Sequence, residues 1–172
     1  MSNNEKPYST IKVVTKGKTE GTDQKGIKIL YDLDKLNDGQ KKLVKAINTS
    51  AIVVAIGRSG VGKTLLTTIE VVKLLKEHKT RKMICTRPNL VISKDGSGGI
   101  DTVSKYLEQV LGTEKLNECL STKKIQSMSI DEIRNITFKN TTLILDQAQF
   151  VTKYELYTIL SRAGKGSATY IQ

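Results

Sequence analysis

Four residues early in this sequence have the spacing of a phosphate-binding loop. Gly57, Gly62, Lys63 and Thr64 fit the pattern G-x-x-x-x-G-K-[ST]. In such a loop, backbone N–H groups and the N-terminus of the following helix face phosphate oxygens. We expect Lys63 to reach the β- and γ-phosphates and the Thr64 hydroxyl to bind Mg²⁺. The other residues of the expected nucleotide-binding loop are Arg58, Ser59, Gly60, Val61 and Leu65.

The flanks of the loop have the periodicity that this interpretation requires. Residues 52–56 are an apolar run rich in β-branched side chains, and they predict a buried strand. Apolar residues then recur at helical spacing over 65–75. The alternative is a glycine-rich turn that matches the pattern by chance, and the strand–loop–helix context argues against it.

A second residue suited to binding Mg²⁺ and phosphate follows another apolar run. Residues 142–145 predict a buried strand, and Asp146 follows them. An aspartate at the end of the strand beside the phosphate-loop strand orients Mg²⁺, so we expect these two strands to be neighbours. The alternative is an ordinary aspartate that ends a buried strand.

Gln40 permits two interpretations. Asn37 and Gln40 have the spacing of a capping box that opens a helix over residues 36–47. The pattern L-N-x-x-Q upstream of a phosphate loop also resembles the Q motif of superfamily 1 helicases, in which the glutamine reads adenine. A glutamine amide can pair with both the donor and the acceptor of adenine.

Composition limits the class of protein. Lys and Arg total 28 against 17 acidic residues, so the formal charge of +11 favours a polyanionic partner such as RNA or single-stranded DNA; a merely basic surface is the alternative. Cys85 and Cys119 lack metal-type spacing, and no signal peptide or membrane-length apolar run is present, which predicts a soluble cytoplasmic protein without a membrane partner.

The remaining chain alternates between predicted helices and strands. We expect a flexible basic arm over residues 1–26 with an edge strand at 11–14, and a nucleotide-binding domain over 27–172. Within that domain, strands are predicted at 27–31, 82–86, 125–128, 136–138 and 168–171, and helices at 101–111, 114–120 and 152–162. A glycine-rich loop is expected at 89–100. Capping boxes are predicted at Ser129 with Glu132 and at Thr152 with Glu155.

Several of these pieces together resemble the PhoH family of ATPases, which is related to superfamily 1 helicase cores. The most specific are Arg87-Pro88 after a strand, the run Asp146-Gln147-Ala148-Gln149, and Leu160-Ser161-Arg162 before Gly164 and Gly166. The resemblance covers about residues 36–171. It implies an α/β fold of three layers with a mainly parallel, RecA-like sheet, and ATP with Mg²⁺ as cofactors. The residues it implicates are Lys63, Asp146, Gln147 and Arg162 in catalysis, Thr64 and Asp146 at the metal, Gln149 at the nucleotide, and Arg87, Lys105 and Arg134 as candidates for nucleic-acid contact.

The chain also departs from the family pattern. Gln147 stands where the family has a glutamate that polarises the attacking water, and an amide cannot accept that proton. We therefore expect ATP binding with slow or absent hydrolysis. The loop at 94–100 lacks the usual proline, and one arginine of the R-G-R-T pattern is missing at 134–137. The chain ends before the family's G-D motif, so we expect a sheet truncated at its C-terminal end with an exposed edge.

Three functions are compatible with these patterns. The leading hypothesis is a helicase-like ATPase that acts on nucleic acid. A non-catalytic switch that binds RNA or single-stranded DNA is the second, and a small phosphoryl-transfer kinase is the third. Arg162 is either a helix C-terminal arginine or, in a ring of identical subunits, a finger that reaches a neighbour's nucleotide. Three roles are compatible with Arg87: phosphate sensing, nucleic-acid contact and loop packing.

Overall fold

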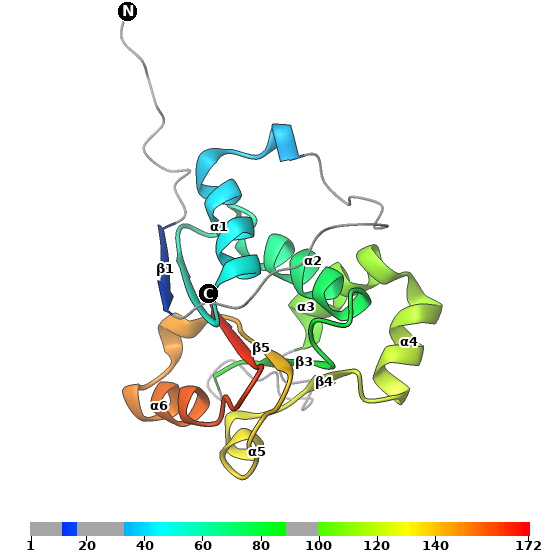
Figure 1. Cartoon of the computed structure of the whole chain (residues 1–172), viewed down its shortest axis with the longest axis vertical. Coiled ribbons are helices and arrows are strands. Elements are labelled where there is room, and N and C mark those ends of the chain that lie inside the picture. Colours follow the sequence, from blue (N-terminus) through cyan, green and yellow to red (C-terminus); the bar gives the residue numbers. More distant parts are fainter. Residues whose placement is uncertain (1–11, 17–32, 89–99) are drawn as a thin grey trace, which may run out of the picture.

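One six-stranded sheet forms the centre of the molecule. The structure is a computed structural model that describes residues 12–16, 33–88 and 100–172 (Figure 1). The strands are β1 (Lys12–Lys16), β2 (Ile52–Ile56), β3 (Lys82–Thr86), β4 (Ile125–Ser127), β5 (Thr141–Leu145) and β6 (Ala168–Ile171). Their order is β1-β2-β6-β5-β3-β4. All neighbours are parallel except β1, which runs antiparallel to β2.

Helices cover both faces of this sheet. They are α1 (Asp38–Thr49), α2 (Lys63–Lys76), α3 (Ile100–Leu111), α4 (Thr113–Ser121), α5 (Ile130–Arg134) and α6 (Lys153–Ser161), with 3₁₀ turns η1 (Leu33–Lys35) and η3 (Ala148–Phe150). In Figure 1, α1 and α2 pack side by side, and α5 and α6 lie together on the other side of the sheet. The predicted three-layer α/β fold with a mainly parallel sheet is confirmed.

Each central strand contributes side chains to two separate cores, because successive side chains of a strand point to opposite faces of the sheet. Met83, Cys85 and Ile144 join the core beneath α1, α2 and α3. Ile84 and Leu143 join the core that includes α5 and α6. A central strand buried on both faces reads as a continuous apolar run, which explains why 82–86 and 142–145 could be recognised from the sequence.

Three helices begin at capping boxes predicted from the sequence. Asn37 caps α1, Ser129 caps α5 and Thr152 caps α6. In each, the capping side chain accepts from the backbone N–H three residues on, and that residue's side chain accepts from the capping residue's N–H. These reciprocal bonds satisfy N–H groups that the first helical turn leaves without partners, so local sequence alone places the three helix starts.

Two predictions about the strands are wrong. Residues 136–138 form no strand, since only Phe138 pairs, in a single bridge with Ala163. Phe138 is buried whereas Ile136 is 36% exposed, so this segment has no apolar face long enough to extend a ladder. The strand before Asp146 is also not the neighbour of β2, because β6 lies between them after the crossover through α6. The sheet edges are β1 and β4, so β6 itself is not exposed at an edge.

Other predictions fall at or beyond the limits of the described residues. The edge strand expected at 11–14 is found as β1, while the rest of the 1–26 arm, the strand predicted at 27–31 and most of the glycine-rich loop lie outside the described residues. Helix α3 begins at Ile100, one residue before the predicted cap Asp101. Among the residues described, no helix has the length and apolar character needed to cross a membrane.

Candidate functional site

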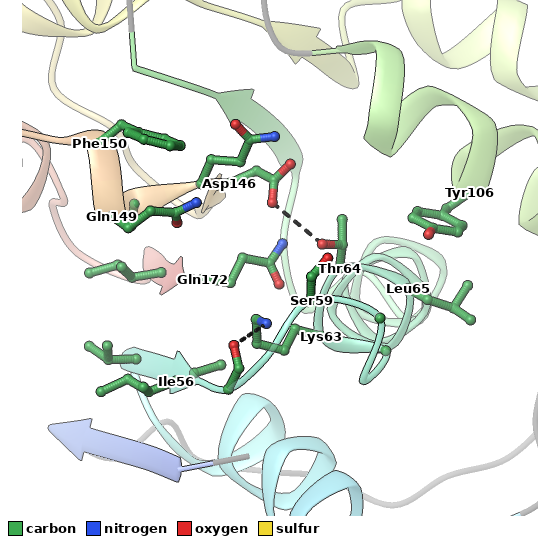
Figure 2. A pocket seen from close by; sticks show the side chains of 18 residues that line it. Ile56, Ser59, Lys63, Thr64, Leu65, Tyr106, Asp146, Gln149, Phe150 and Gln172 are labelled. Atoms are coloured by element: carbon green, nitrogen blue, oxygen red, sulfur yellow. Dashed lines mark hydrogen bonds between the residues drawn. The ribbon is translucent and has the colours of Figure 1, made fainter. Parts of the chain in front are cut away.

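The phosphate loop connects β2 to α2 as predicted, with the helix beginning at Lys63, two residues earlier than expected. Gly60 and Gly62 have φ values of 79° and 88°, which glycine adopts without steric cost. The Lys63 ammonium donates to the carbonyls of Gly57 and Arg58, both at 2.7 Å. Figure 2 shows this ammonium held back against the loop. A bound phosphate would take the place of these carbonyls as its acceptor.

Two opposing effects act on the pKa of the Lys63 ammonium. Partial burial lowers the pKa of Lys63, and the negative charge of Asp146 acts in the opposite direction and raises it. Burial is the larger effect. A partly desolvated ammonium gains more from an incoming phosphate than a fully hydrated one would, because less water must be removed from it on binding.

Asp146 lies at the end of β5, directly opposite the start of α2. Its Oδ1 accepts from the Thr64 hydroxyl at 3.4 Å, and its Oδ2 accepts from Nη2 of Arg87 at 3.0 Å. The Arg87 and Asp146 side chains are only 9% and 8% exposed. Their salt bridge is therefore largely shielded from water, and it fixes the carboxylate in place.

Thr64 and Asp146 fit a magnesium site. A hydroxyl and a carboxylate are hard oxygen ligands, and both face the same point of the cavity (Figure 2). The part of the chain that the structure describes has no cluster of three or more His, Cys, Asp or Glu residues that could hold a metal. Magnesium commonly binds through one or two protein ligands together with substrate phosphates, and this pair supplies that number.

Cys85, on β3, is buried and near enough to Asp146 and Arg87 for both charges to act on its thiol. Burial, with a smaller contribution from Asp146, raises the pKa of the Cys85 thiol to about 12, against an opposing effect of Arg87. The thiolate is the reactive form of cysteine. The Cys85 thiol, 1% exposed, packs as a core side chain and stays protonated near neutral pH.

Gln147 follows Asp146 in an unusual backbone conformation. Its φ of 58° and ψ of 43° are left-handed, a region that costs most non-glycine residues about 1–2 kcal/mol. The next residue, Ala148, donates its N–H to the carbonyl of Gln172 at 2.8 Å. The strained turn is thus tied to the end of β6, and it places Gln147 on the wall of the cavity.

A cavity of about 850 Å³ brings these elements together (Figure 2). Ten of the predicted site residues line it: Gly57, Ser59, Gly60, Gly62, Lys63, Thr64, Leu65, Asp146, Gln147 and Gln149. Sequence reasoning missed the other lining residues, among them Ile56, Tyr106, Phe150 and Gln172. Ile56 and Phe150 are large apolar residues with 54% and 50% of their surface exposed. In the sequence, the only indication that they line the cavity is that they stand directly beside the motif residues Gly57 and Gln149.

Gln40 lies beneath the loop and does not line the cavity. Its Oε1 accepts from the Asn37 N–H at 3.0 Å, which completes the capping box. Its Nε2 donates to the carbonyl of Val61 at 3.1 Å, and this nitrogen is 3.4 Å from where a Cβ on Gly62 would lie. Both ends of the amide are therefore bonded to the chain, and the structure supports the capping interpretation and adds a bond that supports the loop.

Four of the predicted basic residues outside the cavity lining, Arg87, Lys105, Arg134 and Arg162, lie on or after four different elements. Arg87 is buried and pairs with Asp146. Lys105 is exposed on α3. Arg134 on α5 pairs with Asp131 at 3.1 Å and lies over the ring of Tyr154, 5.6 Å from its centroid. Arg162 follows the last turn of α6 and does not line the cavity.

Comparison with known proteins identifies the family of this fold and site. The family model described as PhoH-like protein matches residues 32–172. A PhoH-like protein of Bacillus subtilis is 30% identical over 145 residues, which cover 77% of this chain and 45% of the relative. Protein PhoH of Escherichia coli K12 is 29% identical over 142 residues, covering 75% and 40%. A PhoH-like protein of Synechocystis is 28% identical over 139 residues, covering 74% and 42%. The matched region spans less than half the length of each of these relatives.

Proposed function

This chain belongs to the PhoH-like protein family, and on that premise we propose that its cavity binds ATP with Mg²⁺ and hydrolyses it slowly. The observation that carries the proposal is the convergence of Lys63, Thr64 and Asp146 on one cavity from α2 and β5. Motif and topology agree, since the loop lies at the carboxyl end of β2, where ligands bind in parallel α/β sheets.

Each residue has a role that its position supports. Backbone N–H groups of the loop and the N-terminus of α2 would receive the phosphates. Lys63 would exchange the two loop carbonyls for phosphate oxygens. Thr64 and Asp146 would hold Mg²⁺, which neutralises phosphate charge when bound. Arg87 would keep the Asp146 carboxylate oriented toward the metal.

Slow hydrolysis follows from Gln147. Its amide lines the cavity and can orient a water molecule through hydrogen bonds. An amide cannot accept the proton that the attacking water releases, whereas a carboxylate can. The proposal is thus a nucleotide-binding protein whose turnover is limited at this one position.

The first experiment measures binding of Mg·ATP to the purified protein by calorimetry, beside Lys63→Ala. We expect Lys63→Ala to weaken binding by about 10- to 100-fold, the range for losing hydrogen bonds to a charged group. Lys115→Ala, which removes an exposed lysine on α4, is the matched control and should bind as the wild type does. Absence of binding together with no effect of Lys63→Ala would refute the proposal.

The second experiment compares ATP turnover of the wild type and Gln147→Glu. A correctly placed general base contributes about 10²- to 10⁴-fold, so we expect a clear increase in phosphate release at unchanged ATP affinity. Gln126→Glu on β4 makes the same change outside the cavity and should have no effect. Equal turnover in the three proteins would show that Gln147 does not limit hydrolysis.

We further propose that single-stranded RNA or DNA binds beside α6. Tyr154 and Tyr157 are 65% and 72% exposed, and they are three residues apart on one side of the helix. Arg134 lies over the Tyr154 ring. Exposed aromatic rings beside a cation are the elements on which unpaired bases stack, and the charge of +11 favours the phosphate backbone.

The test is a titration with single-stranded RNA and DNA at two salt concentrations. We expect Tyr154→Ala together with Tyr157→Ala to weaken binding by about tenfold or more, since stacking contributes about 1–3 kcal/mol per base. Lys115→Ala again serves as the control. If ATP changes the affinity for RNA without phosphate release, the protein acts as a nucleotide-dependent switch, which was the second hypothesis. Unchanged affinity in the double variant would place nucleic-acid binding elsewhere or exclude it.

A further inference from the structure

The amino ends of the parallel strands lie at the end of the sheet opposite the cavity. The turns that enter β3, β4, β5 and β6 all reach this end, because these strands are parallel neighbours in the order β6-β5-β3-β4. Each turn carries exposed basic residues within three positions of the start of its strand. We call them the amino-end cations: Arg81, Lys82, Lys123, Lys124, Lys139 and Lys165.

Hydrogen bonds between neighbouring turns hold these cations in one row. The Arg81 N–H donates to the carbonyl of Asn140 at 2.7 Å, and the Asn140 N–H donates to the carbonyl of Lys165 at 3.1 Å. On the other side, the Met83 N–H donates to the carbonyl of Lys124 at 2.8 Å. Neighbouring strands are about 4.8 Å apart, so the row crosses four strands over about 14 Å.

The amino-end cations lack acidic partners. None of the six forms an ion pair with a described residue. Glu118 lies near Lys124, but its carboxylate pairs with Lys115 at 2.6 Å. At the end of α2, Glu77 pairs with Lys79 at 2.7 Å. Like charges without counter-charges repel one another, so the row gains free energy when a polyanion binds to it.

A role at helix C-termini does not account for the row. A cation stabilises the negative end of a helix dipole only within about the last turn. Lys82, Lys139 and Lys165 follow the ends of α2, α5 and α6 by six, five and four residues. These three lysines therefore need another explanation, and they are also the cations best suited to a test.

The surroundings of the row favour a phosphate backbone as its partner. Unpaired bases stack on aromatic rings, and the described turns 77–81, 122–124, 135–140 and 162–167 expose no Phe, Tyr or Trp ring, since Phe138 is 6% exposed. Protein interfaces centre on aromatic or apolar anchors, and in these turns only Ile136, at 36%, is a large apolar side chain that is exposed. A nucleic-acid duplex keeps its bases stacked inside and presents its phosphates outward.

We propose that the amino-end cations bind the phosphate backbone of double-stranded RNA or DNA, without regard to its sequence. The row shares no residue with the lining of the cavity and lies at the other end of the sheet. It is also separate from the α6 tyrosines that we propose to stack unpaired bases. The inference therefore goes beyond the proposed function and does not depend on nucleotide binding, since a duplex and a nucleotide can bind together.

The experiment measures affinity for short RNA and DNA duplexes of two unrelated sequences, by fluorescence anisotropy at several salt concentrations. The row variant combines Lys82→Gln, Lys139→Gln and Lys165→Gln. Its matched control combines Lys41→Gln, Lys42→Gln and Lys45→Gln, which removes three exposed lysines of α1 and gives the same net charge.

We expect the row variant to bind every duplex at least about tenfold more weakly than the wild type, and the control to change by less than about twofold. The slope of log affinity against log salt should fall by about 3 in the row variant, because each phosphate contact contributes about 0.9 to it. The two sequences should bind alike, since phosphate contacts carry no sequence information.

A second variant keeps the test independent of folding. The turns are held by main-chain groups of Lys139 and Lys165, so the row variant should unfold at the same urea concentration as the wild type. Lys82→Arg, Lys139→Arg and Lys165→Arg together keep the charges and should retain the wild-type affinity for each duplex. A role in packing alone would not follow the charge in this way.

The outcomes decide the proposal whether or not ATP binds. Equal losses in the row variant and the α1 control would mean that total charge alone matters, and would overturn it, as would an unchanged affinity of the row variant. A row variant that keeps its duplex affinity but loses binding to polyglutamate, or to vesicles of phosphatidylserine and phosphatidylcholine, would identify a protein or membrane partner instead. A loss confined to the row variant and absent from the arginine variant would establish the site.

Discussion

The two walls of the cavity differ in how their polar side chains are held. The loop wall, residues 57–64, is a continuous piece of chain in which the Lys63 side chain bonds to its own main-chain carbonyls. The strand-end wall consists of Asp146, Gln147 and Gln172, from β5 and β6, and a buried salt bridge to Arg87 fixes it. The Lys63 bonds of the loop wall can be exchanged for bonds to a ligand. The side-chain positions of the strand-end wall, in contrast, are fixed when the chain folds. Changes in the two walls should therefore affect different quantities.

The largest effect on stability is expected from Asp146→Ala. The substitution leaves the Arg87 charge buried without its carboxylate, and breaking a buried pair in this way costs about 3–5 kcal/mol. Urea unfolding in the absence of nucleotide measures the loss. A cost below about 1 kcal/mol, the value of an exposed pair, would mean that the strand-end wall is not fixed by this salt bridge.

The loop wall should behave in the opposite way in Lys63→Ala. Its two bonds are made to loop carbonyls beside water, so the free energy of unfolding should stay within about 1 kcal/mol of the wild type. The same variant loses most of its ATP affinity if the proposed function holds. A large loss of stability in Lys63→Ala would remove the contrast between the two walls.

A smaller effect, a gain, is expected from Gln147→Gly. Glycine adopts the left-handed conformation without strain but loses more freedom on folding, so a net stabilisation of about 0.5–1 kcal/mol should appear in urea unfolding. Lys123→Gly, at a φ of 55° in the turn before β4, is the matched control outside the cavity. A gain at Lys123 without one at Gln147 would show that contacts of the Gln147 side chain offset the strain.

The last effect is absent near neutral pH and concerns Cys85 at alkaline pH. Well below pH 9.0 the thiol is protonated in folded and unfolded chains alike, so it adds no pH dependence there. Between pH 9.0 and about 12 the unfolded chain releases this proton and the folded chain keeps it, which lowers stability as pH rises. Unfolding of Cys85→Ala measured on both sides of pH 9.0 should show a shallower decline. An identical decline in both proteins would contradict the burial of this thiol.

The contrast between the walls also explains what could be predicted from the sequence. The loop wall is local, so glycine spacing and the flanking periodicity placed Gly57–Thr64 correctly, and capping boxes placed three helix starts. The strand-end wall depends on which strands are neighbours. The insertion of β6 between β2 and β5 brings Gln172 to the cavity, and no local pattern indicates this because β6 is short and its pairing is remote.

The Gln40 side chain illustrates the same limit at a single residue. Its capping role was visible from Asn37 three positions away. Its bond to the Val61 carbonyl joins residues 21 positions apart and depends on how α1 packs against α2. Sequence patterns located the residue, and the tertiary fold decided which of its groups are used.

The central place of β6 has a consequence for the order of events during synthesis. The pair β1–β2 and the group β5-β3-β4 are joined within the sheet only through β6, the last of these strands to be made. While residues 168–171 are still inside the ribosome, two incomplete half-sheets expose unpaired strand edges at β2 and β5. Such edges favour pairing with other chains until β6 lies between them. The strand that brings Gln172 to the cavity is thus also the one that joins the two parts of the described sheet.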